Sequence, residues 1–203
     1  MQLQIKQKAI VQTFILVIFN LVVLALQTWI ENTVGIKSVE TESRKWIEDN
    51  PDSFIFFVIV FAPICEEFAF RYFLRREKYV GAILLLSTAF FLVSIEQISL
   101  IWITVFLNIL YAYFLLVKKY ETLPTWLIIY SIIVFSAIHY GNFQKEKINE
   151  LHLIEMLFQF VPFVLLGVNL TYIRLKYGFV YCLIGHSLYN AMLVSLHYLS
   201  TNF

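Results

Sequence analysis

Apolar residues occur along the chain in long stretches that short polar segments separate. Each stretch approaches the roughly 20 residues that a helix needs to cross the hydrocarbon of a bilayer. We expect every stretch to be helical, because a backbone in lipid must satisfy its own hydrogen bonds and no alternating pattern of a β-barrel is present. The expected spans are residues 9–30, 54–74, 80–95, 98–117, 124–141, 151–173 and 178–199. The pattern predicts an all-α, polytopic transmembrane helix bundle with about seven spans.

Composition agrees with an integral membrane protein. Of the 203 residues, 60% are hydrophobic and only 14% are charged, whereas a soluble domain carries about 25% charged residues. A net charge of +1 is too small to indicate a nucleic-acid partner. No repeat or low-complexity linker divides the chain, so we expect one domain over residues 1–203, with its motifs within 54–199. The first stretch lacks a small-residue cleavage site and predicts a retained helix.

Lysine and arginine indicate the orientation. With the N-terminus in the cytoplasm, the inner side receives Lys6, Lys8, Arg75, Arg76, Lys78, Lys118, Lys119, Arg174 and Lys176. The outer side receives Lys37, Arg44, Lys45, Lys145 and Lys147. Because cytoplasmic loops carry the excess of basic residues, this distribution predicts a cytoplasmic N-terminus and an external C-terminus. A short chain of this kind suggests a prokaryotic plasma membrane.

Two adjacent glutamates and an arginine interrupt the second apolar stretch, which reads FAPICEEFAFRYFLRR over residues 61–76. A charge at the centre of a transmembrane helix costs about 2.5–3.5 kcal/mol, so such residues usually face the bundle interior and mark a functional site. Glu67 and Arg71 are four residues apart, and we expect them to pair on one helix face. Glu66 points about 100° away and needs either a partner from another helix or a raised pKa. Pro63 lacks a backbone N–H and predicts a kink.

Polar side chains deep in the later spans are candidates for that partner. His139 lies in the fifth span, and His186 lies midway along the seventh, where Asn190 follows one helical turn later. A carboxylate and an imidazole can remove a proton from water, while a second imidazole and an amide donate hydrogen bonds to the resulting oxyanion. Glu66, His139 and His186 equally suit a catalytic Zn²⁺, which takes three protein ligands. The spacing of these residues favours neither version.

An alternative of another class uses the same residues. Intramembrane glutamates and histidines also form proton relays, so a proton-coupled transporter remains open, as does a catalytically inactive protein that binds a peptide. The role of Asn190 separates these classes. A transporter tolerates the loss of Asn190 better than the loss of Glu66, whereas an oxyanion hole without its amide slows on the order of 10²-fold.

Three motifs resemble those of a known family. The segments EEFAFR (66–71), FSAIH (135–139) and HSLYN (186–190) are similar to Glu-Glu-x-x-x-Arg, Phe-x-x-x-His and His-x-x-x-Asn of the CPBP intramembrane proteases. This family contains CAAX prenyl endopeptidases together with bacteriocin-processing and immunity relatives. The resemblance implies an endopeptidase that hydrolyses a membrane-associated or prenylated protein or peptide. An inactive immunity protein is the alternative within the family.

The resemblance also implies a role for each matched residue. Glu66 with His139 would activate the attacking water, and His186 with Asn190 would form the oxyanion hole. Glu67 with Arg71 would hold the motif helix. The family is described both as metal-dependent, with Glu66, His139 and His186 as ligands of a Zn²⁺, and as glutamate-dependent without a metal, and the sequence leaves both open.

Phe135 precedes His139 by one turn, and its residue type favours an ordinary core aromatic. Cys65 and Cys182 lie close to the motifs, but neither has a base at a fixed spacing, so we expect both to be buried and unreactive.

The chain departs from the family pattern between its first two motifs. Residues 71–135 hold two further apolar spans, which implies an inserted hairpin. The depths of the motifs also differ. At about 1.5 Å per helical residue, Glu66 lies roughly 13 Å from Arg75, whereas His139 lies roughly 22 Å from Pro124. We therefore expect residues 118–124 to project inward, with the fifth helix beginning outside the hydrocarbon.

Overall fold

Helices make up the part of the chain that the structure, a computed structural model, describes. This part comprises residues 2–34, 51–75, 79, 81–83, 85–86, 88, 98–139 and 153–202. The α-helices are α1 (Gln2–Val34), α3 (Pro51–Phe56), α4 (Ala62–Phe70), α6 (Ile98–Ala112), α7 (Thr125–Ile138), α9 (Leu153–Tyr177) and α10 (Phe179–Asn202). Two π-helical segments, η1 (Phe57–Phe61) and η3 (Tyr113–Val117), and the 3-10 turn η2 (Tyr72–Leu74) complete the set. The expectation of an all-α bundle is confirmed.

Three described helices are long and apolar enough to cross a membrane. They cover Lys6–Val34, Phe158–Tyr177 and Phe179–Leu199, close to the first, sixth and seventh expected spans. Two shorter apolar helices, Trp102–Val117 and Thr125–Ile138, correspond to the fourth and fifth expected spans.

The second expected span is an uninterrupted helical run, Pro51–Phe70, formed by α3, η1 and α4. The irregularity expected at Pro63 takes the form of the π-helix η1 directly before α4. The third expected span, 80–95, lies largely outside the described residues.

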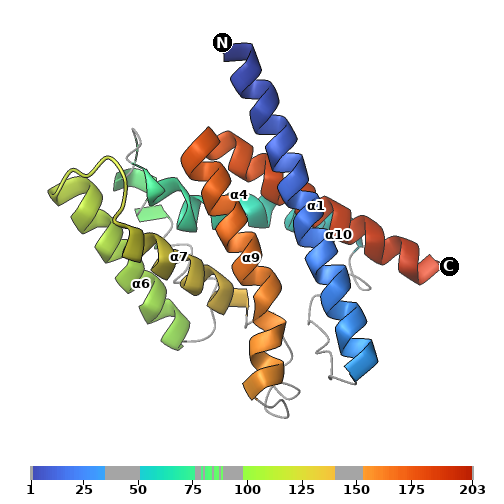
Figure 1. The fold of residues 1–203 in the computed structure, drawn as a ribbon. Coiled ribbons are helices and arrows are strands. Elements are labelled where there is room, and N and C mark those ends of the chain that lie inside the picture. Colours follow the sequence, from blue (N-terminus) through green and yellow to red (C-terminus); the bar gives the residue numbers. More distant parts are fainter. Residues whose placement is uncertain are drawn as a thin grey trace.

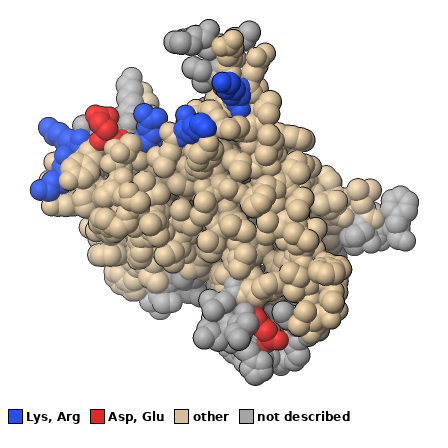
Figure 2. Space-filling view, viewed as in Figure 1, with Lys and Arg blue, Asp and Glu red and all other residues tan. Residues whose placement is uncertain are grey.

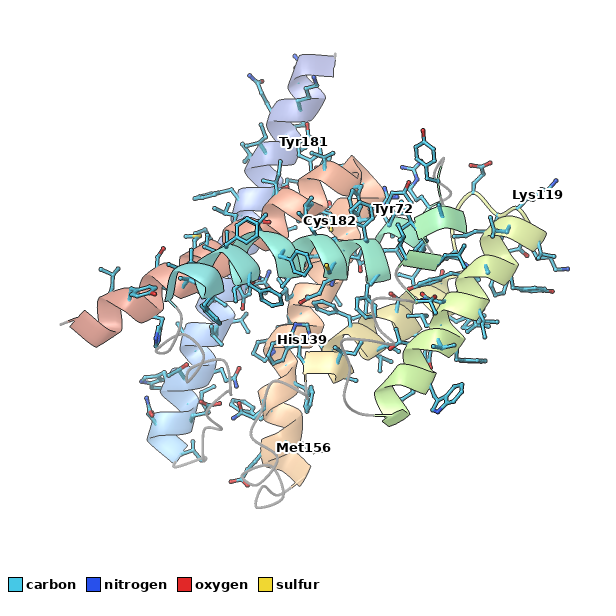
Figure 3. The ribbon with its side chains drawn as sticks, turned by 180° about the vertical axis from the view of Figure 1, so that it is seen from behind. Tyr72, Lys119, His139, Met156, Tyr181 and Cys182 are labelled. Atoms are coloured by element: carbon cyan, nitrogen blue, oxygen red, sulfur yellow. The ribbon has the colours of Figure 1, made fainter. Side chains whose placement is uncertain are left out.

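The long helices form a framework that α4 crosses. Helix α1 packs against α9 and α10, and α7 packs against α9 on the other side. The run of α3, η1 and α4 passes across α9 and contacts α10 along η1 and α4 (Figures 1 and 3). Residues that are far apart in the sequence therefore meet around α4.

The C-terminal end of α4 is held by side chains from two other helices. Arg174 of α9 donates from Nε to the carbonyl oxygen of Arg71 at 2.9 Å and from Nη2 to that of Tyr72 at 3.0 Å. The hydroxyl of Ser131, in α7, donates to the carbonyl oxygen of Phe70 at 3.0 Å. A helix end leaves its last carbonyls unpaired and attracts cations. Arg174, counted above as a charge of the inner surface, is instead buried, with 1% of its area exposed.

The segment after α4 lies beside the loop that precedes α7. The backbone N–H of Leu123 donates to the carbonyl oxygen of Leu74 at 3.2 Å, and Arg75 forms an isolated antiparallel bridge with Thr122. The two helices that carry the first and second motifs are therefore joined at one end. The inward projection of residues 118–124 refers to a membrane plane and stays a prediction.

The exposed lysines among the described residues gather at one end of the molecule. Lys6 and Lys8 lie at the start of α1, Lys118 and Lys119 in the loop before α7, and Lys176 at the end of α9. These chain segments lie toward the same end of the fold (Figure 1). Figure 2 shows the basic side chains along the upper edge of the face drawn, above a broad surface with almost no charge. This distribution is typical of a protein whose flanks lie in lipid.

Polar contacts and one small residue fix α1 in the bundle. Asn169 of α9 donates to Oδ1 of Asn20 at 3.1 Å, and Gln159 donates to Oε1 of the buried Glu31 at 2.8 Å. Helices α1 and α10 approach so closely at Gly185 that a Cβ atom there would lie 2.9 Å from Cγ2 of Thr13. Side-chain hydrogen bonds and small residues are what hold helices together in lipid.

We predict that Gly185→Ala destabilises the bundle, because the added methyl group overlaps Thr13 and overpacking costs on the order of 1–3 kcal/mol. The measurement is the midpoint of thermal unfolding in detergent. Thr13→Ser removes the overlapping methyl group and should restore most of the loss in the double variant. Gly81→Ala is the control, since the nearest atom to its Cβ lies at 4.0 Å. An equal midpoint for Gly185→Ala and wild type would contradict the close packing.

Candidate active site

Glu67 is fully buried, and three side chains donate to it. Its carboxylate accepts hydrogen bonds from the guanidinium of Arg71, from Nδ1 of His186 at 2.8 Å and from Sγ of Cys182 at 2.8 Å. The ion pair expected between Glu67 and Arg71 is thus present. A buried carboxylate is tolerated only when it is paired and hydrogen-bonded in this way. Glu67 joins α4 to α10, and none of its surface is exposed to a reacting group.

Glu66 occupies a different environment, as its rotation around the helix predicts. Its side chain is 26% exposed, and its Oε2 lies 3.7 Å from Nε2 of His139 and 3.7 Å from Nε2 of His186. These separations are too long for hydrogen bonds. Oε2 is buried and has no hydrogen-bond partner among the described residues. The carboxylate and two imidazoles thus surround a position that a single water can bridge.

The protonation pattern of both imidazoles follows from their Nδ1 partners. Nδ1 of His139 lies 2.8 Å from the carbonyl oxygen of Phe135, and Nδ1 of His186 lies 2.8 Å from the Glu67 carboxylate. Both oxygens only accept, so we assign the proton to Nδ1 in each ring. In the neutral rings, Nε2 is then an acceptor. Two acceptor nitrogens therefore face Oε2 of Glu66.

Phe135 does more than fill the core. The guanidinium carbon of Arg71 lies 4.0 Å from the centroid of its ring, an arrangement that favours a cation. Its edge also meets the rings of His139 at 4.6 Å and His186 at 6.2 Å between centroids. Phe163 of α9 stacks on the other side of His139 at 4.6 Å. The interpretation of Phe135 as an ordinary core aromatic was therefore incomplete, because the ring contacts three residues of the motifs.

Asn190 follows His186 by one turn on α10, as its spacing indicates. Its amide nitrogen donates to the carbonyl oxygen of Val58, in η1, at 2.9 Å. An amide nitrogen carries two hydrogens, so a second donor remains beside the first. The side chain is half-buried.

The difference in depth that the sequence predicted between Glu66 and His139 does not keep these two residues apart. His139 lies at the C-terminal end of α7, and its Nε2 is 3.7 Å from Oε2 of Glu66. The two residues meet although His139 is more residues from the start of α7 than Glu66 is from the end of α4. Because α4 crosses the framework, its length does not measure depth along the bundle. Figure 3 places Cys182 and His139 on opposite sides of α4.

Sequence reasoning missed two residues of this region. Both cysteines were expected to be buried; this is wrong for Cys65, which is half-buried, and right for Cys182, whose thiol also donates to Glu67. Its position four residues before His186 was the available signal, since both then share one face of α10. Arg174 was assigned to the surface, whereas it caps α4. Its last-turn position in an apolar helix did not reveal the partner.

The three candidate metal ligands lie near one another. Within the described residues, no three side chains of His, Cys, Asp or Glu are grouped closely enough to hold a metal ion. Glu66, His139 and His186 are the residues whose donor atoms converge, at 3.7 Å from the carboxylate oxygen.

We predict that the two adjacent glutamates differ in what their loss does. Glu67→Gln puts an NH₂ group among three donors and leaves the Arg71 charge buried without its partner, which costs on the order of 3–5 kcal/mol. Thermal unfolding in detergent should show a clear loss for Glu67→Gln. Glu66→Gln is the matched control and should unfold close to the wild type. Equal losses for both variants would contradict the different environments.

In a comparison with protein families, residues 50–192 match the family described as type II CAAX prenyl endopeptidase Rce1-like. Searches of curated proteins and of solved structures gave no significant match. The matched region contains all three motifs and covers well over half of the chain, while α1 precedes it. The resemblance drawn from the motifs is thereby confirmed, and the chain belongs to the Rce1-like family of type II CAAX prenyl endopeptidases.

Proposed function

We propose that the protein hydrolyses peptide bonds in the membrane with Glu66 as the catalytic carboxylate. At the level of the family it is a CAAX-type intramembrane endopeptidase. The observation that carries the assignment to Glu66 is its unpaired, buried Oε2, which two imidazole nitrogens face at 3.7 Å. Glu67 suits this role less well, because it is fully buried and already accepts hydrogen bonds from three side chains.

The proposed reaction begins with a water between Glu66 and His139. Glu66 takes one proton from this water, and Nε2 of His139 accepts a hydrogen bond from its second O–H group and so orients it. The water oxygen attacks the carbonyl carbon of the scissile bond, which becomes a tetrahedral oxyanion. The proton then passes to the leaving amine nitrogen as the C–N bond breaks. No covalent intermediate with the protein forms.

His186 and Asn190 are proposed to stabilise the oxyanion. Asn190 has a second amide hydrogen to donate. His186 can donate from Nε2 only as an imidazolium, because Nδ1 already donates to Glu67, so the neutral ring must first take up a proton from solvent. The Glu67 carboxylate stabilises the imidazolium that results, as a buried carboxylate does for a catalytic histidine in other hydrolases. Glu67 thus supports the site through His186.

We propose that the substrate is a membrane-associated or prenylated, CAAX-type protein or peptide. The family description supports this class. The half-buried position of Glu66 within an apolar bundle supports a substrate that reaches the site from the membrane. No residue of the site distinguishes a prenylated from an unprenylated peptide.

Glu66→Gln should lower kcat on the order of 10²-fold or more, because the carboxamide cannot accept a proton from water. The measurement is cleavage of a fluorogenic peptide library, farnesylated and unprenylated, by purified protein in detergent. Wild type and variant are assayed with and without a chelator. Loss on chelation would indicate a bound metal, and resistance would favour activation of water by Glu66 and His139.

Two controls make this result interpretable. Thermal unfolding of Glu66→Gln should match that of the wild type, so that lost activity is not lost folding. Cys65→Ser changes the neighbouring residue of α4 and should retain activity, since its thiol has no proposed role. Equal cleavage by wild type and Glu66→Gln would refute the assignment.

We also propose that the N-terminus is cytoplasmic, in a plasma membrane of prokaryotic type. The exposed lysines at one end of the molecule support this orientation. A cysteine that replaces Lys119 should then react with a membrane-impermeant maleimide in inside-out vesicles but not in intact cells. The wild type gives the background, since Cys182 is buried and Cys65 is half-buried in α4. Labelling in intact cells would reverse the orientation.

A further inference from the structure

The helix that carries Glu66 contains a carbonyl without a donor in its own backbone. In the π-helix η1 each hydrogen bond joins residues that are five positions apart, so the N–H of Ala62 donates to the carbonyl oxygen of Phe57. Val58 is next in line, and its donor at the same spacing would be residue 63. That residue is Pro63, which has no N–H. The π-helix and the proline together therefore release the carbonyl oxygen of Val58 from the helix.

Asn190 satisfies this carbonyl from another helix. Its Nδ2 donates to the oxygen of Val58 at 2.9 Å. A buried carbonyl without a donor is costly, and this is especially so in lipid, where water cannot replace the missing partner. The contact therefore compensates for a defect that the sequence creates at Pro63.

Asn190 and His186 together attach α10 to the Glu66 helix at two points. His186 donates to Glu67, and one turn later Asn190 donates to Val58, nine residues earlier on the same helical run. Arg174 and Ser131 hold the C-terminal end of this run, so loss of the Asn190 contact would release the run at its other end, near Val58. Two attachments fix its direction across α10, and with it the position of the Glu66 carboxylate opposite the imidazoles.

We propose that Asn190 is a positioning residue that sets the place of Glu66 through the carbonyl of Val58. The proposal rests on the function proposed for Glu66 and adds a role to Asn190 that is separate from the oxyanion hole. It also gives Pro63 a role, because the proline reserves the carbonyl of Val58 for Asn190. A displacement of about 1 Å in a reacting group can cost on the order of 10²-fold in rate.

The test restores the missing donor. Asn190→Ala should lower kcat on the order of 10²-fold, lower the unfolding midpoint and raise amide hydrogen exchange in residues 57–61. Pro63→Ala supplies a backbone N–H to the released carbonyl. The double variant Asn190→Ala/Pro63→Ala should therefore recover the midpoint, the exchange protection and at least a tenfold part of the lost kcat.

Pro162→Ala is the matched control, because Pro162 lies inside α9 and not in the helical run that carries Val58. It should restore nothing in the Asn190→Ala background. If Asn190 acts only in the oxyanion hole, Asn190→Ala leaves the midpoint and the exchange of residues 57–61 unchanged and Pro63→Ala rescues no activity, which overturns the proposal.

The structural measurements separate this proposal from the proposed function. A wild type without protease activity would refute the function assigned to Glu66. The unfolding midpoint and the amide hydrogen exchange of Asn190→Ala, with and without Pro63→Ala or Pro162→Ala, would still decide whether Asn190 holds the carbonyl of Val58. Recovery of both structural quantities without recovery of kcat would overturn the claim that Asn190 positions Glu66.

Discussion

The buried carboxylate of Glu67 is the constraint around which the rest of the site is arranged. A charge at this position in a membrane bundle must be compensated inside the protein. Arg71 compensates it within α4, while His186 and Cys182 do so from α10. Since these donors belong to two helices, the need to satisfy one carboxylate fixes how α4 and α10 pack. The same contacts orient the imidazole of His186.

The chemistry proposed for Glu66 depends on this arrangement. The two glutamates are adjacent in sequence, yet the rotation of about 100° per residue gives them different neighbours. Glu67 takes the donors, so Glu66 is left with two imidazole nitrogens that are themselves acceptors. A carboxylate that faces acceptors needs a proton carrier or a water between them. The absence of a direct hydrogen bond at Oε2, among the described residues, is therefore part of what makes Glu66 the better candidate.

The sequence was sufficient to predict those features that depend on helical spacing and on composition. Apolar stretches gave the all-α class, and the spacing of Glu67 and Arg71 gave their ion pair. It did not reach contacts that depend on how helices cross. The estimate of depth assumed that every helix runs along the membrane normal, and it therefore placed His139 at a different depth from Glu66. In the structure α4 runs across the bundle, so this assumption fails. Arg174 was assigned to the surface because its partners are backbone carbonyl oxygens of another segment, and no pattern of residue types indicates such partners.

The first helix shows that the site depends on more than the region shared with the family. Helix α1 precedes residues 50–192, yet it contacts α10 at Gly185, directly beside His186. Its polar contacts with α9, through Asn20 and Glu31, fix its rotation and its position along the bundle. Since an apolar face alone gives little preference in lipid, these hydrogen bonds and the glycine contact set the register of α1. A helix outside the motifs thus supports the helix that carries two of the proposed site residues.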